Sequence, residues 1–174
     1  MRRKTLIKAV LLVPFLAIYY RYFLIPNYPF PGPPPDALQS HEPADVEETF
    51  RRAYFTDYTR DQVIAHYKAQ LGFLPVLRLN YPPEDAQTII RDQTRSWYLE
   101  ELVHPLRGSL YINGFISQKP QDDIVINDKM YVEKITIKYV PSNLFVRIAV
   151  ATGILFSIYF LFKEWKKALL SRSL

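Results

Sequence analysis

Two long apolar stretches lie near the ends of this chain of 174 residues, and a segment of mixed polar and apolar pattern lies between them. The later stretch, residues 142–162, carries no charge from Ile148 to Phe162, and Arg147 alone interrupts its earlier part. This length approaches the roughly 20 residues that cross a bilayer, so it predicts a transmembrane helix. Ser142 and Asn143 suit its N-cap, and we expect the Arg147 side chain to extend back to the lipid headgroups.

The earlier apolar stretch, residues 9–25, follows the basic segment 1–8 and predicts an uncleaved signal anchor, because no small-x-small cleavage site follows it. Residues 26–42 are rich in proline and predict an extended, stiff spacer. Residues 163–174 are basic and partly amphipathic, which favours a tail that lies on the inner membrane surface or docks on a cytoplasmic partner.

The segment 43–141 reads as one folded domain, and its best-specified element is a helix. Residues 49–56 predict a strand, and Thr59 and Gln62 then match a capping box. Gly72 is suited to end the helix in a left-handed conformation. Between these signals the apolar residues recur at helical spacing and form one face, made of Val63, Ile64, Tyr67 and Leu71.

The remainder of the domain alternates in the manner of strands after a second, short helix. Residues 74–81 predict a strand, and Pro82-Pro83 open a helix that buries Ala86, Ile89 and Ile90. Further strands are predicted over 97–103, over 109–116 with a break at Asn113-Gly114, over the short segment 123–126, and over 129–140 after a turn at Asn127-Asp128. We therefore predict an α+β outer domain between two transmembrane helices, with the order β-α-β-α-β-β-β and two helices on one face of a mostly antiparallel sheet.

The charge pattern predicts a topology rather than a nucleic-acid partner. Segments 1–25 and 143–174 hold ten of the 22 basic residues and one of the 17 acidic residues, which leaves 12 bases and 16 acids between them. By the positive-inside rule both termini lie in the cytoplasm and the central domain lies outside. Residues 26–142 lack an N-x-S/T site, and with the uncleaved anchor this favours the bacterial cytoplasmic membrane.

Motifs for chemistry are weak, so we assign no catalytic, cofactor-binding or metal-binding residue. Glu101 and His104 form a single Glu-x-x-His, whereas di-iron sites use two on bundle helices. Asp122, Asp123 and Asp128 lack the spacing and the closing glutamate of a calcium-binding loop. A serine-nucleophile elbow and a phosphate-binding glycine loop are both missing from the sequence.

Aromatic residues are numerous for so small a domain, and an alternating sheet cannot bury all of them. We therefore predict an exposed interaction surface made of Tyr98, His104, Arg107, Tyr111 and Phe115. Small residues recur at every fourth position of the second apolar stretch and predict a helix-packing stripe, for the first anchor or for a second copy of the chain. This stripe consists of Ala149, Gly153 and Ser157.

These features favour a membrane-anchored interaction or assembly module for another envelope protein, without enzymatic activity and without a cofactor. One alternative is an extracytoplasmic sensor or ligand-binding module, because the last strand enters the second anchor directly. The other is a small membrane-bound enzyme. Its polar cluster would have to come from Asp57, Arg60, Glu100, Glu101, His104 and Arg107.

Overall fold

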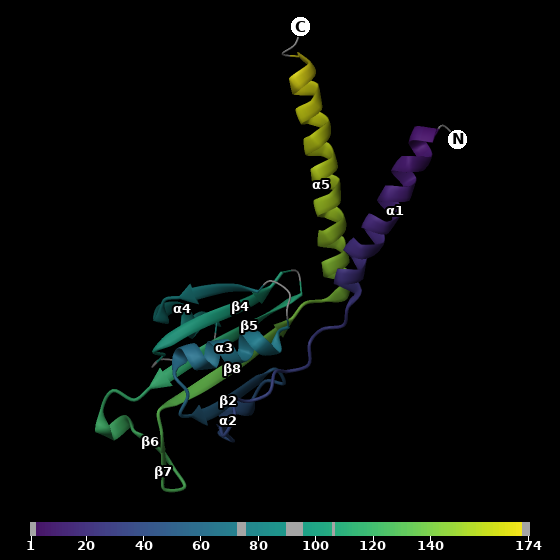
Figure 1. Cartoon of the computed structure of the whole chain (residues 1–174). Helices are drawn as coiled ribbons and strands as arrows, with labels where there is room; N and C mark the ends of the chain where they lie inside the picture. Colours follow the sequence, from purple (N-terminus) through teal and green to yellow (C-terminus); the bar gives the residue numbers. More distant parts are fainter. Residues whose placement is uncertain (1–2, 73–75, 90–95, 106, 172–174) are drawn as a thin grey trace. The chain divides into compact units, whose positions relative to one another are not determined.

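The structure is a computed structural model that describes residues 3–72, 76–89, 96–105 and 107–171 (Figure 1). The chain divides into two compact units. One unit combines residues 1–26 with residues 142–174, and the other comprises residues 27–141. The first is helical, and the second contains the sheet.

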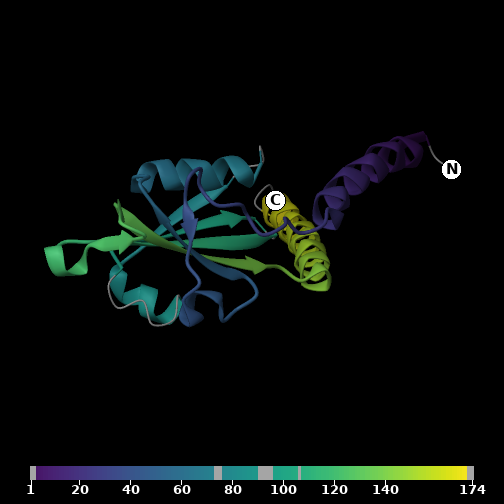
Figure 2. The same ribbon diagram turned by 90° about the horizontal axis from the view of Figure 1, so that it is seen from below.

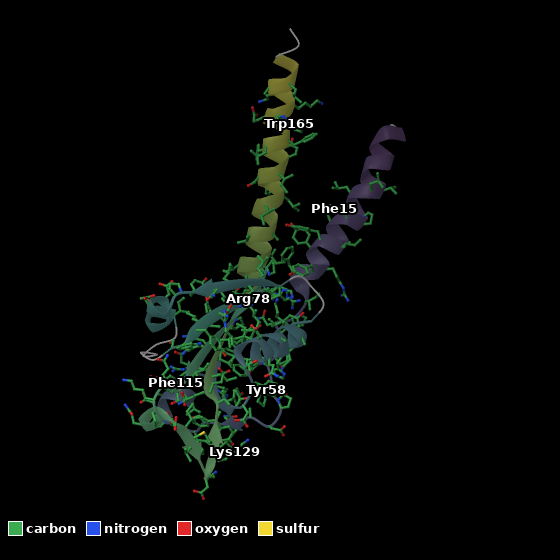
Figure 3. The ribbon with its side chains drawn as sticks, turned by 60° about the vertical axis from the view of Figure 1, so that its left-hand side comes forward. Phe15, Tyr58, Arg78, Phe115, Lys129 and Trp165 are labelled. Carbon is green, nitrogen blue, oxygen red and sulfur yellow. The ribbon has the colours of Figure 1, made fainter. Side chains whose placement is uncertain are left out.

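The helical unit pairs α1 (Arg3–Leu24) with α5 (Leu144–Ser171). Leu144–Leu169 is long and apolar enough to cross a membrane, whereas the apolar part of α1, Val10–Leu24, is shorter. Among the described residues α5 is thus the one candidate span. The predicted span over residues 9–25 stays a prediction. Apolar side chains project from both helices, as Phe15 and Trp165 show (Figure 3). Asn143 caps α5 as expected, since its Oδ1 accepts a hydrogen bond from the Phe145 N–H at 2.8 Å.

Polar contacts join the end of α1 to the start of α5. The Tyr19 hydroxyl donates to the Ala151 carbonyl at 3.0 Å, and the Tyr20 hydroxyl lies 2.9 Å from Thr152 Oγ1. The Arg147 guanidinium donates from Nη1 to the Ile25 carbonyl at 3.0 Å. Our prediction that Arg147 extends toward the headgroups stays a prediction. A carbonyl just past the end of α1 has no intrahelical donor, and a cation is favoured at a helix C-terminus.

The second unit is built on a six-stranded antiparallel sheet with the order β1-β2-β8-β5-β4-β3. A two-stranded ladder of β6 (Ile124–Ile126) and β7 (Lys129–Tyr131) is separate from it. The unit is therefore α+β, as predicted. The strands of the large sheet are β1 (Leu38–Gln39), β2 (Arg51–Thr56), β3 (Leu77–Tyr81), β4 (Tyr98–His104), β5 (Gly108–Ile116) and β8 (Glu133–Pro141).

Helix α3 (Arg60–Gln70) covers one face of this sheet and forms the main core with it. Tyr67 and Val63 of α3 are fully buried against strand residues such as Leu102, Ile112 and Ile137. Burying each aliphatic side chain contributes about 1.5–3 kcal/mol. Along β8 the apolar face is buried, as its alternation predicted, but the opposite face is not fully exposed, because Thr136 on it is buried as well.

Helix α4 (Pro83–Ile89) lies on the other face, so the prediction of two helices on one face was wrong (Figure 2). The side chains of successive strand residues point to opposite faces. Tyr98 belongs to the core with α3, whereas its neighbour Leu99 is buried against Ile89 of α4. The short helix α2 (Pro43–Val46) contacts β2, and the single turn η1 (Pro120–Asp122) precedes β6.

Several local signals act as predicted. The Thr59 backbone N–H donates to Gln62 Oε1 at 2.8 Å, which completes the capping box. Gly72 has a φ of +89°, and the Asn127-Asp128 turn joins β6 to β7 with both residues at positive φ. The predicted break at Asn113-Gly114 was wrong, because β5 pairs continuously with β4 and β8 through both residues.

The proline-rich segment is extended, but it packs on the sheet unit instead of standing free. Tyr28 and Phe30 pack against the main core. The backbone of Gly32 is held at both groups by the Gln70 side chain, which accepts from its N–H at 2.7 Å and donates to its carbonyl at 3.1 Å. Leu38 and Gln39 then add a short edge strand. This segment therefore belongs to the folded unit.

Candidate functional site

The five residues predicted to form an interaction surface do not form one. Tyr98, His104 and Arg107 are buried, with at most 5% of each exposed. Tyr111 is half-buried against Leu99 on the α4 face, and Phe115 packs with a separate cluster around Phe55 and Tyr131. The prediction failed because β4 and β5 are central strands whose two faces are both covered. The stripe of Ala149, Gly153 and Ser157 is exposed on α5.

His104 and Arg107 instead belong to a small aromatic cluster with Tyr28. The His104 ring lies 5.4 Å from the Tyr28 ring, and the Arg107 guanidinium lies 4.9 Å above the same ring. Burial, together with the charge of Arg107, lowers the pKa of His104. The two residues thus hold the proline-rich segment against the sheet.

The residues that an enzyme would have needed are dispersed over the sheet unit. Arg60 and Glu100 form an ion pair, but Asp57 pairs with Lys129, and Glu101 lies on the opposite face, where it accepts a hydrogen bond from Tyr81. Within the part of the chain that the structure describes, no three His, Cys, Asp or Glu side chains gather in a way that could hold a metal ion.

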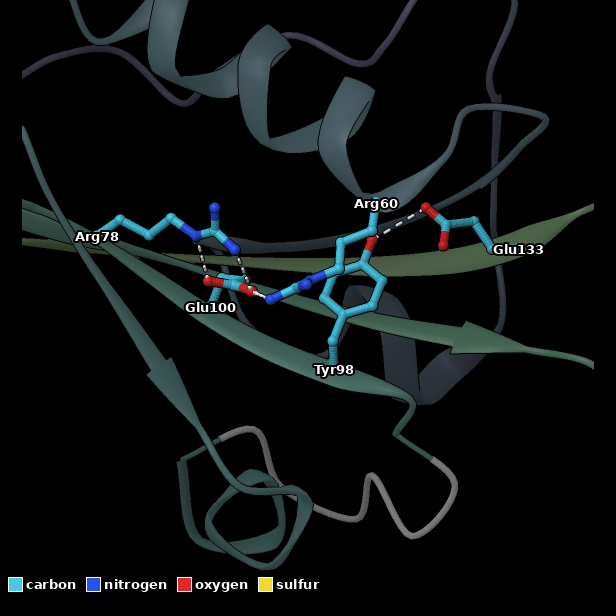
Figure 4. Close-up of polar contacts among 5 residues, drawn as sticks. All are labelled: Arg60, Arg78, Tyr98, Glu100 and Glu133. Carbon is cyan, nitrogen blue, oxygen red and sulfur yellow. Dashed lines mark hydrogen bonds and ion pairs between the residues drawn. The ribbon is translucent and has the colours of Figure 1, made fainter.

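A polar cluster inside the α3 face brings together residues from α3, β3, β4 and β8 (Figure 4). Its centre is Glu100, whose side chain is fully buried and binds two guanidinium groups. Arg78 donates to it from Nε at 2.7 Å and from Nη2 at 3.1 Å, and Arg60 pairs with its Oε1. Burial alone would raise the pKa of Glu100, but the hydrogen bonds from Arg78 and Arg60 outweigh it and lower that pKa.

Tyr98 and Glu133 extend the cluster. The Tyr98 hydroxyl donates to Glu133 Oε1 at 3.0 Å, and the Arg60 guanidinium lies 5.5 Å from the centre of the Tyr98 ring. Glu133 is fully buried, and its second oxygen has no hydrogen-bond partner among the described residues. Burial raises the pKa of Glu133 to about 7, against a smaller lowering by the Tyr98 hydrogen bond.

A cavity of about 460 Å³ opens beside Tyr81, at the end of β3, and Tyr98, at the start of β4. Arg60 is the only charged side chain among its described lining residues. Trp97, which is 53% exposed, presents an aromatic surface there, and Asn80 presents an amide. The lining consists of Arg60, Asn80, Tyr81, Pro82, Trp97 and Tyr98. Such a set combines a cation, an amide and aromatic surface, which is suited to binding a ligand.

Strand β3 borders this cavity and forms an edge of the sheet. Among the described residues no strand lies beyond it, and its residues 77–80 are exposed. Leu77 is 58% exposed and Leu79 is 44% exposed, both on the α4 face. The opposite edge, β1, has two residues. Natural edge strands are usually short or carry charges. The one charged residue of β3, Arg78, is bound to Glu100, and on the other face the strand presents two exposed leucines.

Sequence reasoning identified the residue types of this site but missed the site itself. Arg60 and Glu100 were candidates for a different role, and Arg78, Asn80 and Trp97 were not selected. Arg78 and Glu100 are 22 positions apart, and only the pairing of β3 with β4 makes them neighbours. The alternation of leucine with polar residues along Leu77–Tyr81 was the available signal for a strand, but it contains no information on which strand lies at an edge.

Comparison of the chain with protein family models, with curated proteins and with solved structures finds no match.

Proposed function

We propose that this chain is a two-span membrane protein whose central unit acts outside the membrane as a non-enzymatic interaction module for another envelope protein. The contact is an extended segment of the partner that pairs with β3. The observation that carries this proposal is the exposed edge strand Leu77–Tyr81, with Leu77 and Leu79 exposed on one face. Addition of a strand to such an edge is a recurrent way to bind an extended segment, since backbone hydrogen bonds supply affinity and side-chain pockets supply specificity.

The membrane part of the proposal is supported by α5 and by the distribution of charge. Helix α5 has the length and composition of a span, and basic residues flank both apolar stretches. We place both termini in the cytoplasm and the sheet unit outside a bacterial cytoplasmic membrane. The contacts of Tyr19, Tyr20 and Arg147 between the helices support α1 as a second anchor that is paired with α5.

Crosslinking in intact membranes tests the module. A photoreactive amino acid replaces Leu79, and a matched control carries it at Lys68, which is exposed on α3 away from the edge strand. We expect a specific protein adduct from position 79 that is weak or missing from position 68. Leu77→Lys in the same chain should reduce this adduct, because a charge in the apolar strip opposes strand pairing. Lipid adducts alone, or equal adducts from both positions, would contradict the proposal.

A further inference from the structure

We infer that the cavity beside β3 binds a carboxylate carried by the partner segment, so that the module selects an extended strand with an acidic residue. This inference rests on the proposed function, because it assigns chemistry to the strand that β3 receives. Its evidence is the arrangement of the charged groups around the cavity.

Arg60 is the group that meets the ligand. It is the only charged residue among the described lining residues, and its side chain is 34% exposed. A guanidinium has five N–H donors, and Arg60 donates to Glu100 from Nη2. Donors therefore remain for a second carboxylate, and charge-assisted hydrogen bonds of this kind are strong.

The acidic groups nearby do not cancel this charge at the cavity. Glu100 is fully buried, and Arg78 binds both of its oxygens from the side of β3. The hydrogen bond to Glu100 raises the pKa of Arg78, and the charge of Asp61 adds to this rise. Glu100 balances only one of the two guanidinium charges of Arg60 and Arg78, so one positive charge is left, and of these two residues Arg60 lines the cavity.

The location of Asn80 connects the cavity to the edge strand. Asn80 pairs with Glu100 in the β3–β4 register, so its side chain lies on the α3 face, where the cavity is. A strand added beside β3 places a side chain about 5 Å from that of Asn80 on the same face. An acidic side chain at this place lies at the mouth of the cavity that Arg60 and Trp97 line.

Charge also distinguishes this partner from a second copy of the chain. If two β3 strands paired about Leu79, the Arg78 and Arg60 groups of both copies would gather on one face of the joint sheet. Like charges across paired strands are destabilising. An acidic segment is instead attracted by the guanidinium groups of Arg60 and Arg78.

The test is a selection from a library of random nonapeptides on the full chain in detergent micelles, with Leu79→Lys as the counter-selection. We expect the selected peptides to be enriched in aspartate or glutamate at one position. Replacing that residue with the matching amide should weaken binding about tenfold, measured by Trp97 fluorescence in a Trp165→Phe background. Asn80→Asp is an isosteric change that adds a negative charge at the cavity. It should lower the affinity for the acidic peptide and leave the affinity for the amide peptide unchanged.

The outcomes separate the inference from the proposed function. Selected peptides without an acidic preference, or equal binding of the acid and amide forms, would refute the carboxylate site and leave the edge-strand function standing. No enrichment over the Leu79→Lys counter-selection would contradict both. A dimer of the parent chain that Leu79→Lys dissociates, detected by light scattering, would identify a second copy as the occupant and overturn the acidic partner.

Discussion

The ring of Tyr98 lies directly against the backbone of Gly114, so that a Cβ on this glycine would stand 2.2 Å from the ring Cε1. The two residues pair across β4 and β5. The Tyr98 ring passes over the glycine, and its hydroxyl donates to Glu133. The position of the Tyr98 hydroxyl in the buried cluster therefore depends on a missing side chain on the neighbouring strand. This relationship explains why a glycine occurs within a central strand.

Gly114→Ala is predicted to destabilise the sheet unit by about 1–3 kcal/mol, because the new methyl group must displace a buried ring. Chemical denaturation of the full chain in mild detergent, followed by Trp97 fluorescence, measures the change. Gly153→Ala is the matched control, since a Cβ at Gly153 meets no atom within 4 Å. Tyr98→Val should reduce the cost of the alanine, and strictly additive effects of the two changes would contradict this explanation.

Stability is predicted to fall as the pH rises through the titration of Glu133. Its pKa is raised from 4.5 to about 7 by burial, so the folded state binds its proton more tightly than the unfolded state. The free energy of unfolding then decreases between pH 4.5 and pH 7, by about 3 kcal/mol for a shift of this size.

Glu133→Gln should remove this decrease, since glutamine does not titrate. The variant is expected to match the parent near pH 4 and to be more stable above pH 7 in denaturation measured across that range. Glu84→Gln, at an exposed position of α4, serves as the control and should keep the pH profile of the parent. Parallel profiles of the parent and Glu133→Gln would show that Glu133 has an ordinary pKa.

Arg147→Leu is predicted to loosen α1 from α5, because the Ile25 carbonyl loses its donor. The chain has no cysteine, so cysteines in place of Tyr20 and Thr152 can be joined selectively by a short bismaleimide. The yield of crosslinked product should fall several-fold in the variant. Arg21→Leu, which changes an exposed arginine of α1, should leave the yield unchanged. An equal fall in both variants would indicate a loss of charge and not of this contact.

The proposed topology predicts which cysteines an impermeant maleimide can label in intact cells. Met130→Cys, on the exposed β6–β7 hairpin, should react without permeabilisation, and Lys167→Cys, near the end of α5, should react only after it. If Lys167→Cys reacts in intact cells, the C-terminal end of α5 lies outside and the predicted orientation is wrong.

The sequence by itself determined the elements whose signals are local. The Thr59–Gln62 capping box, the turn at Asn127-Asp128 and the apolar run of α5 each depend on residues within one helix or one hairpin, and the structure contains all three. Alternation of side chains also identified the antiparallel strands. These signals are readable because hydrogen bonding and burial act there between near neighbours in the chain.

Only the tertiary structure decided which face each helix covers and which strand lies at the edge. The pattern of α4 predicts that Ile89 packs on the sheet, but only its contact with Leu99 places it opposite α3. The Arg60–Glu100–Arg78 cluster likewise needs the pairing of β3 with β4 and the seating of α3 on the sheet. These interactions join residues 22 and 40 positions apart, so tertiary packing sets them. For this reason the sequence predicted an exposed aromatic surface at residues that the fold buries. It also gave no sign that β3 lies at an edge of the sheet.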